Sequence, residues 1–110
     1  MTPQGSERRL FPRVPPHCAV LVEALDARQP WLSGPAEDLS PGGCQILLEQ
    51  RLRLGQPIRL TLHLSARVVK AEGFVAHVEA ARAGGWETGV SFLRIAPEGL
   101  CVLRRALGRQ

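Results

Sequence analysis

Residues 58 to 64, IRLTLHL, alternate strictly between apolar and polar side chains. The apolar positions are Ile58, Leu60, Leu62 and Leu64, and the polar positions between them are Arg59, Thr61 and His63. This period of two residues is that of a β-strand with one buried face and one exposed face. The segment therefore predicts a strand in a sheet whose apolar face is covered by the rest of the chain.

Several further segments have the composition of short strands. They are residues 18–25, 44–50, 68–78 and 86–95, and another predicted strand opens at Trp31. Turn residues mark the boundaries at Gly34-Pro35, Pro41-Gly42-Gly43, Gly55-Gln56-Pro57 and Ala83-Gly84-Gly85. Short strands at regular spacing, separated by glycine and proline, predict a β-sandwich or a β-barrel.

The segment VVKAEGFVAHV, residues 68–78, changes the face of its apolar side chains at a glycine. Val69 and Ala71 lie on the inner face up to Gly73. After the glycine the apolar positions are Phe74, Ala76 and Val78. A glycine at such a change of phase predicts a β-bulge, which bends a strand around a small barrel.

The C-terminal segment, APEGLCVLRRALGRQ, has a helical period instead. Pro97 suits the first position of a helix, Glu98 its first turn and Gly108 its end. The apolar stripe of this helix is Leu100, Leu103 and Leu107. We expect the stripe to pack on the chain's own sheet, so the whole sequence predicts about six strands followed by one short helix.

The composition argues against several classes of protein. No apolar segment is long enough to span a membrane, and the N-terminus lacks the pattern of a signal peptide. Cys18, Cys44 and Cys101 are an odd number of cysteines in apolar surroundings, which is typical of reduced thiols in the cytoplasm. Histidines and cysteines lack metal-binding spacing, so we expect no metal and no cofactor. No catalytic motif is present, and we expect no enzymatic activity.

Positive charge is carried almost entirely by arginine. The chain has 14 Lys and Arg against 10 Asp and Glu, and Lys70 is the single lysine. Guanidinium groups bind phosphates and guanine edges through paired hydrogen bonds, which lysine cannot do. Arg8, Arg9 and Arg13 lie close together in a stretch without a helical or strand period. This cluster therefore indicates an anionic partner.

A second motif, DLSPGG, occupies residues 38–43 between two predicted strands. By itself it is ordinary turn chemistry and needs no function. In combination with Arg9-x-x-x-Arg13 before it and Gly89-Val90-Ser91-Phe92 after it, however, the pattern resembles the PilZ domain family from end to end. The resemblance implies a mainly β fold, a six-stranded antiparallel β-barrel. It also implies binding of cyclic di-GMP, a bacterial second messenger with two guanines and two phosphates.

The resemblance assigns the arginines of the N-terminal arm to the ligand. Arg9 and Arg13 match the two arginines of the family motif and would bind phosphate or guanine. Arg8 extends the cluster, and in that position it favours an intercalated pair of ligands over a single one. The arm would be loosely held without ligand and would close over it when bound.

The resemblance places the remaining site residues on the barrel. Asp38 would accept hydrogen bonds from guanine N1–H and N2–H2, and Ser40 would add a hydroxyl contact. Gly43 would allow the ligand and the incoming strand to approach closely. Trp86 is the candidate for stacking on a guanine. In an unbroken strand it would face the core instead, and whether Gly89 shifts that phase is left open by the sequence.

The expected organisation is a single PilZ-like domain over residues 1–110. It comprises a flexible arginine-bearing arm (1–16), a β-barrel (17–95) and a C-terminal helix (96–110). The expected partners are cyclic di-GMP and a downstream effector protein, with no nucleic acid and no membrane insertion. With one domain, output would pass to the effector through ordering of the arm.

Two other functions are compatible with the same fold. Some members of the family are protein-interaction adaptors, for example in type IV pilus assembly, and do not bind the nucleotide. They lack the arginines and the Asp-x-Ser-x-x-Gly residues, which are present here. A small basic barrel could also bind nucleic acid nonspecifically, but that function favours exposed aromatic residues, and aromatic residues of any kind make up only 5% of this chain.

Overall fold

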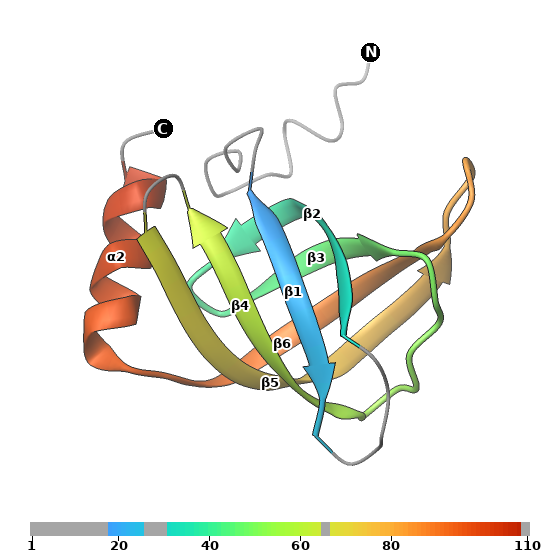
Figure 1. Cartoon of the computed structure of the whole chain (residues 1–110), viewed down its shortest axis with the longest axis horizontal. Coiled ribbons are helices and arrows are strands. Elements are labelled where there is room, and N and C mark those ends of the chain that lie inside the picture. The colour runs from blue at the N-terminus through green and yellow to red at the C-terminus, as the bar shows by residue number, and fades with distance from the viewer. Residues whose placement is uncertain (1–17, 26–30, 65–66, 109–110) are drawn as a thin grey trace.

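The computed structural model describes residues 18–25, 31–64 and 67–108, and six antiparallel strands in these ranges form a closed barrel (Figure 1). The strands are β1 (Ala19–Ala24), β2 (Leu32–Ser40), β3 (Gly43–Leu48), β4 (Pro57–Leu64), β5 (Arg67–Ala80) and β6 (Trp86–Ile95). Their order around the barrel is β1-β2-β3-β6-β5-β4, and pairing of β1 with β4 closes it. The predicted six-stranded barrel is confirmed. The predicted arm, residues 1–16, lies outside the described residues.

The core is the apolar face of these strands. In β4 the four apolar positions of the alternating segment are all buried, and Arg59 and His63 are exposed. In β3 Cys44, Ile46 and Leu48 are buried in the same way. Alternation of this kind fixes the register, because a slip of one residue would turn every apolar side chain to water.

The predicted change of face at Gly73 is wrong. On β5, the residues Val69, Ala71, Gly73 and Val75 all face the core. Ala76 is an extra residue of β5 that has no partner on β6. A Cβ on residue 73 would overlap the backbone carbonyl oxygen of Ser91 on β6. The glycine therefore permits close approach of two strands. The register between β5 and β6 does shift at Glu72/Gly73, where β6 carries the extra residue, and it shifts again at Ala76, so a bulge is present at Gly73 although the apolar face of β5 does not change there.

The predicted turn at Gly34-Pro35 is also wrong, because both residues lie inside β2. Pro35 stands opposite Ala19 of β1. A Cβ on residue 34 would overlap the carbonyl oxygen of Leu47 on β3. Long-range strand pairing thus determines the conformation here, although the local sequence favours a turn.

The helix α2 (Pro97–Gly108) follows β6 after one residue and packs against β5 and β2. Leu103 and Leu107 are buried and Leu100 is partly buried, so the predicted packing of the stripe on the barrel is confirmed. Figure 1 shows the helix lying beside the barrel near the start of β5.

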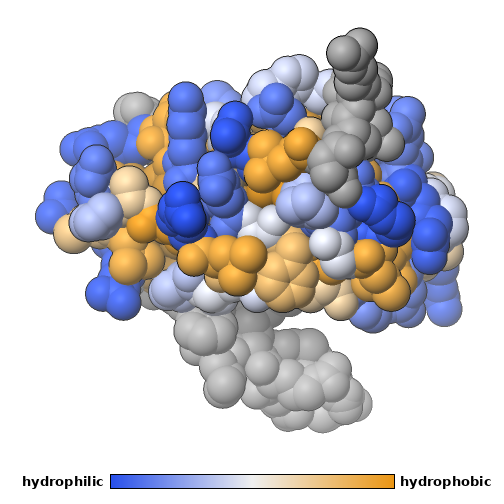
Figure 2. Space-filling model, turned by 90° about the horizontal axis from the view of Figure 1, so that it is seen from below, coloured by the Kyte–Doolittle hydropathy of each residue, from blue (hydrophilic) through white to orange (hydrophobic). Residues whose placement is uncertain are grey.

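The surface is mixed in polarity. Seen from below, a band of apolar side chains runs between hydrophilic ones (Figure 2). In the part of the chain that the structure describes, no helix is long and apolar enough to cross a membrane.

Candidate ligand-binding site

A β-bulge in β2 turns the first part of the DLSPGG motif to the outside of the barrel. Ala36 pairs with Ile46 and Asp38 with Gln45, so Glu37 is an extra residue without a partner on β3. Ala36 and Leu39 are both buried although they are three residues apart. Asp38 and Ser40 consequently lie on the outer face, where a ligand can reach them.

The rest of the motif forms a tight hairpin between β2 and β3. Ser40 pairs with Gly43, and Pro41 and Gly42 make the turn. The Ser40 hydroxyl oxygen accepts a hydrogen bond from the Gly42 backbone N–H at 3.2 Å, and it lies 3.4 Å from the Gly43 carbonyl oxygen. The hydroxyl thus stabilises the conformation of the turn, as expected for serine at this position.

Gly43 is required by the barrel itself. It stands opposite Ser91 of β6, and a Cβ on residue 43 would overlap the carbonyl oxygen of Val90. At Gly42 the nearest atom to such a Cβ is the Ser40 hydroxyl oxygen at 3.9 Å. The close approach of the strand that we predicted at Gly43 is therefore confirmed, while the approach of a ligand there stays a prediction.

Acidic side chains surround Asp38 on the outer face. The Gln45 side chain, opposite Asp38, donates a hydrogen bond from Nε2 to Oε1 of Glu87 at 3.1 Å. Burial raises the pKa of Glu37, and the charges of Glu87 and Asp38 raise it further, while a hydrogen bond with Gln45 lowers it. This concentration of negative charge suits a cationic side chain or a hydrogen-bond donor.

Sequence reasoning missed Gln45 and Glu87 as parts of the site. Gln45 alternates with the buried Cys44 and Ile46, and its position two residues after Gly43 is a signal that could have identified it. Glu87 has no such signal, because only the pairing of β3 with β6 brings it to Gln45.

Trp86 lies away from the motif. It pairs with Leu48, at the end of β3 opposite to Gly43, about 17 Å along the strand at the usual rise per residue. β6 runs without an extra residue past Gly89, so Trp86 shares the inner face of Thr88. The Arg51 guanidinium lies 5.5 Å from the centre of its ring. The structure thus brings Asp38, Ser40 and Gly43 together but does not bring Trp86 to them.

The other predicted site residues and the cysteines complete this account. Arg8, Arg9 and Arg13 lie outside the described residues. Cys18 and Cys44 are buried, and burial raises the pKa of both thiols, that of Cys44 to about 12 with a contribution from the charge of Cys18. Over residues 18–25, 31–64 and 67–108, no group of three or more His, Cys, Asp or Glu is placed to hold a metal ion.

Comparison with known proteins gives the family. The model of the PilZ domain family matches residues 7–109. Among solved structures, the inhibitor of motility MotI/DgrA of Bacillus subtilis has a TM-score of 0.75 at 18% identity, covering 99% of this chain and 55% of that chain. The PilZ domain of YcgR from Escherichia coli, solved with c-di-GMP, has a TM-score of 0.69 at 19% identity, covering 93% of this chain and 90% of that one. No curated protein matches the chain. Since the family model matches nearly all of its length, the chain belongs to the PilZ domain family.

Proposed function

We propose that this chain is a receptor for cyclic di-GMP that relays the level of the second messenger to a protein partner. The observation that carries the proposal is the outward placement of Asp38 and Ser40 beside Gly43, on a hairpin of a PilZ-family barrel. The chain acts as a binding module rather than as an enzyme. We place it in the cytoplasm, with neither nucleic acid nor membrane as a partner.

The chemistry of the hairpin suits a guanine. A carboxylate at Asp38 accepts from both N1–H and N2–H2 of guanine, and adenine does not offer these two donors in that arrangement. Gly43 and Gly89 contribute no side chain to this face, so a planar base can approach the strands closely. The Ser40 hydroxyl, held by Gly42, supplies a positioned polar group beside the base.

The arm supplies the positive charge that the ligand requires. Two phosphates make cyclic di-GMP a dianion, and forked guanidinium groups at Arg9 and Arg13 bind a phosphate or guanine O6 and N7 through paired hydrogen bonds. Acidic residues around Asp38 would also attract the arm to this face. Ligand binding then orders residues 1–16 over the barrel, and the ordered arm changes the surface that an effector meets.

The solved neighbours support both parts of the proposal. The YcgR structure is described as a PilZ domain with c-di-GMP, and the Bacillus subtilis protein as an inhibitor of motility. The present chain covers only 55% of the Bacillus subtilis protein. Control of motility by the present chain is therefore a proposal.

Isothermal titration of cyclic di-GMP into the full chain at physiological salt tests the function, with cyclic di-AMP and GTP as competitors. Guanine-selective binding at micromolar or lower concentration would support the proposal and give the number of ligands bound. A folded protein that releases no heat and shows no competition would contradict it, and would favour an adaptor that does not bind the nucleotide.

A further inference from the structure

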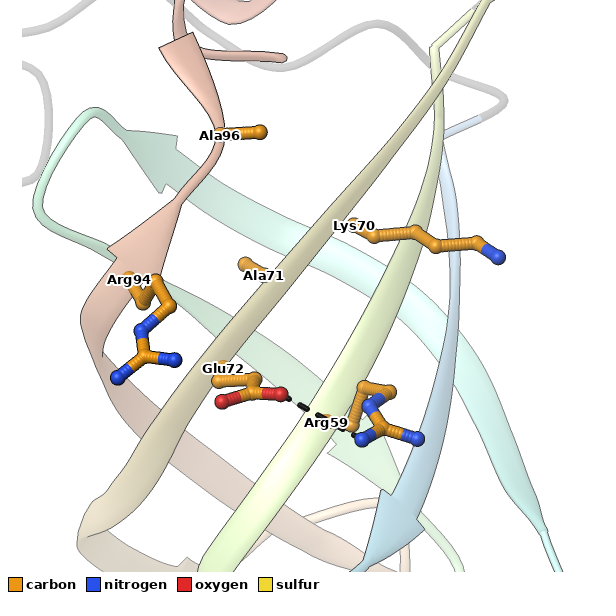
Figure 3. A pocket seen from close by; sticks show the side chains of 6 residues that line it. All are labelled: Arg59, Lys70, Ala71, Glu72, Arg94 and Ala96. Atoms are coloured by element: carbon orange, nitrogen blue, oxygen red, sulfur yellow. Dashed lines mark hydrogen bonds and ion pairs between the residues drawn. The ribbon is translucent and has the colours of Figure 1, made fainter.

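A basic pocket lies on the surface of the barrel, at the end of β6. It has a volume of about 220 Å³ and is formed on β4, β5 and the end of β6 (Figure 3). The residues that line it are Arg59, Lys70, Ala71, Glu72, Arg94 and Ala96. Three of the six are cations and one is an acid, and the two alanines leave space between the charged side chains.

A row of alternating charges crosses four strands at this pocket. The register places Glu23, Arg59, Glu72 and Arg94 side by side on β1, β4, β5 and β6. The Arg59 guanidinium lies 3.5 Å from a Glu23 carboxylate oxygen and 3.4 Å from one of Glu72. Arg59 is therefore neutralised within the protein and is not the main attraction for an anion.

Lys70 and Arg94 remain for a ligand. Within residues 18–25, 31–64 and 67–108, neither of them forms an ion pair. They are diagonal neighbours on β5 and β6, about 7–8 Å apart at the backbone. Figure 3 shows their side chains on different sides of Glu72. Two separate carboxylates can thus each reach one cation without competing for the same group.

A β-bulge adds an exposed apolar side chain beside the pocket. Gly73 pairs with Phe92 and Glu72 with Arg94, so Leu93 is an extra residue of β6. Without the bulge Arg94 would face the core, whereas here Leu93 and Arg94 both face water. Leu93 is 72% exposed, more than any other large hydrophobic side chain among the described residues.

These observations indicate a protein segment and argue against a nucleic acid. A continuous phosphate backbone would meet the carboxylate of Glu72 between the two cations and that of Glu23 beyond, which is unfavourable. An acidic peptide can place its carboxylates at the cations and avoid these positions. The exposed Leu93 suits an aliphatic side chain of such a peptide and offers no ring for a base to stack on.

We propose that Lys70, Leu93 and Arg94 form a docking surface for an acidic protein segment that carries an aliphatic side chain. The inference deepens the proposed function, on which it rests, by giving the chemistry of the effector. The Phe92 backbone N–H, next to Leu93, donates to the Gly42 carbonyl oxygen at 2.9 Å. Leu93 and Arg94 of the docking surface therefore lie on the strand to which the turn of the proposed nucleotide site is hydrogen-bonded.

The test is a titration of the ¹⁵N-labelled full chain, without nucleotide, with the peptide acetyl-EELEE-amide. Controls are the peptide with glutamine in place of glutamate and a single-stranded oligothymidylate. The variant Lys70→Glu/Arg94→Glu is compared with Arg82→Glu/Arg104→Glu, which changes two exposed arginines elsewhere. Each reversal lowers the net charge by two, so both variants go from +4 to zero. Leu93→Ser removes the apolar contact alone.

The expected result is a change in the amide chemical shifts of residues 68–72 and 92–96, with the acidic peptide only. Affinity should fall about fivefold or more in the Lys70/Arg94 variant and less than about twofold in the Arg82/Arg104 variant. Leu93→Ser should weaken binding about threefold.

Several outcomes would overturn the inference. They are an equal loss of peptide affinity in the two charge variants, chemical-shift changes confined to other residues, no chemical-shift changes at all, or tighter binding of the oligothymidylate to the same surface. If the Lys70/Arg94 reversal unfolds, Lys70→Gln/Arg94→Gln replaces it. Because nucleotide is absent, failure of cyclic di-GMP binding would reject the proposed function without changing this result.

Discussion

The backbone N–H of Phe92 donates a hydrogen bond of 2.9 Å to the carbonyl oxygen of Gly42. This contact joins the turn of the Asp-x-Ser-x-x-Gly motif to β6, one residue before the bulge at Leu93. The residue of β6 that contacts the turn of the proposed nucleotide site is thus the direct neighbour in sequence of Leu93 in the proposed docking surface. A shift of the turn on ligand binding would act directly on the backbone that carries Leu93.

Replacing Gly43 by alanine should destabilise the fold. The added Cβ would overlap the Val90 carbonyl oxygen, and relief requires β3 and β6 to separate. We expect a decrease in the free energy of unfolding of about 2 kcal/mol, measured by urea denaturation. Gly42→Ala is the matched control, because its Cβ meets nothing closer than 3.9 Å, and its effect should stay within about 0.5 kcal/mol. Equal stability of the two variants would contradict the close packing of β3 on β6.

Arg9→Ala and Arg13→Ala should each weaken cyclic di-GMP binding without affecting the barrel. Loss of a charge-assisted bidentate contact costs about 2 kcal/mol, or about 30-fold in the dissociation constant. The measurement is calorimetric titration, with thermal unfolding as a check of folding. Arg82→Ala, an exposed arginine in the turn between β5 and β6, is the control and should bind normally. Unchanged affinity in the Arg9/Arg13 double variant would reject a role for the arm.

Asp38→Ala should reduce the preference for cyclic di-GMP over cyclic di-AMP. The ratio of the two dissociation constants should fall about tenfold, the size of one lost bidentate base contact. Glu37→Ala removes the same charge one residue earlier, at the bulge, and should keep the ratio. Ser40→Ala should cost less affinity than Asp38→Ala. If Asp38→Ala retains full selectivity, guanine is recognised elsewhere.

The strands were largely predictable because their apolar period is a local property. Alternation at Ile58 to Leu64 identifies the inner face without knowledge of the partner strands. The hairpin from Ser40 to Gly43 is local as well, so the barrel part of the candidate site could be assembled from sequence. Trp86 could be assigned only in part, since its face depends on whether the strand is continuous at Gly89.

A bulge near Gly73 could be predicted, but which residues are extra could not, because that depends on strands distant in sequence. At residues 73–76 either Phe74 or Val75 could face the core by local pattern. The choice of Val75 follows from the close approach of Gly73 to Ser91. The extra residue at Leu93 exists only relative to β5. The basic pocket beside it was therefore invisible in the sequence.

Glu37→Gln should change the pH dependence of stability. Partial desolvation of this largely exposed side chain, together with the charges of Glu87 and Asp38, raises the pKa of Glu37 above the ordinary 4.5. The folded state therefore holds this proton more tightly than the unfolded state, and stability falls as the pH rises from about 4.5 through the folded pKa. The variant should lose this decrease in the free energy of unfolding, which is only about a few tenths of a kcal/mol because the side chain is exposed. The measurement is urea unfolding at pH values from 4 to 7. Glu49→Gln, exposed after β3, is the control. Parallel profiles for wild type and Glu37→Gln would contradict the account.

Thiol labelling should distinguish the three cysteines. Cys101 is exposed on α2, whereas Cys18 and Cys44 are buried, and burial raises the pKa of Cys44 to about 12. At pH 8 the thiolate fraction of Cys44 is about 10⁻⁴, so it reacts only when the barrel opens. Reaction with Ellman's reagent should show one fast thiol per chain, and Cys101→Ser should abolish the fast phase. Because the folded thiols hold their protons more tightly than the unfolded ones, stability should also fall as the pH rises above about 9. Three thiols reacting at the same rate in the native protein would show that the interior beside Gly43 is open to solvent.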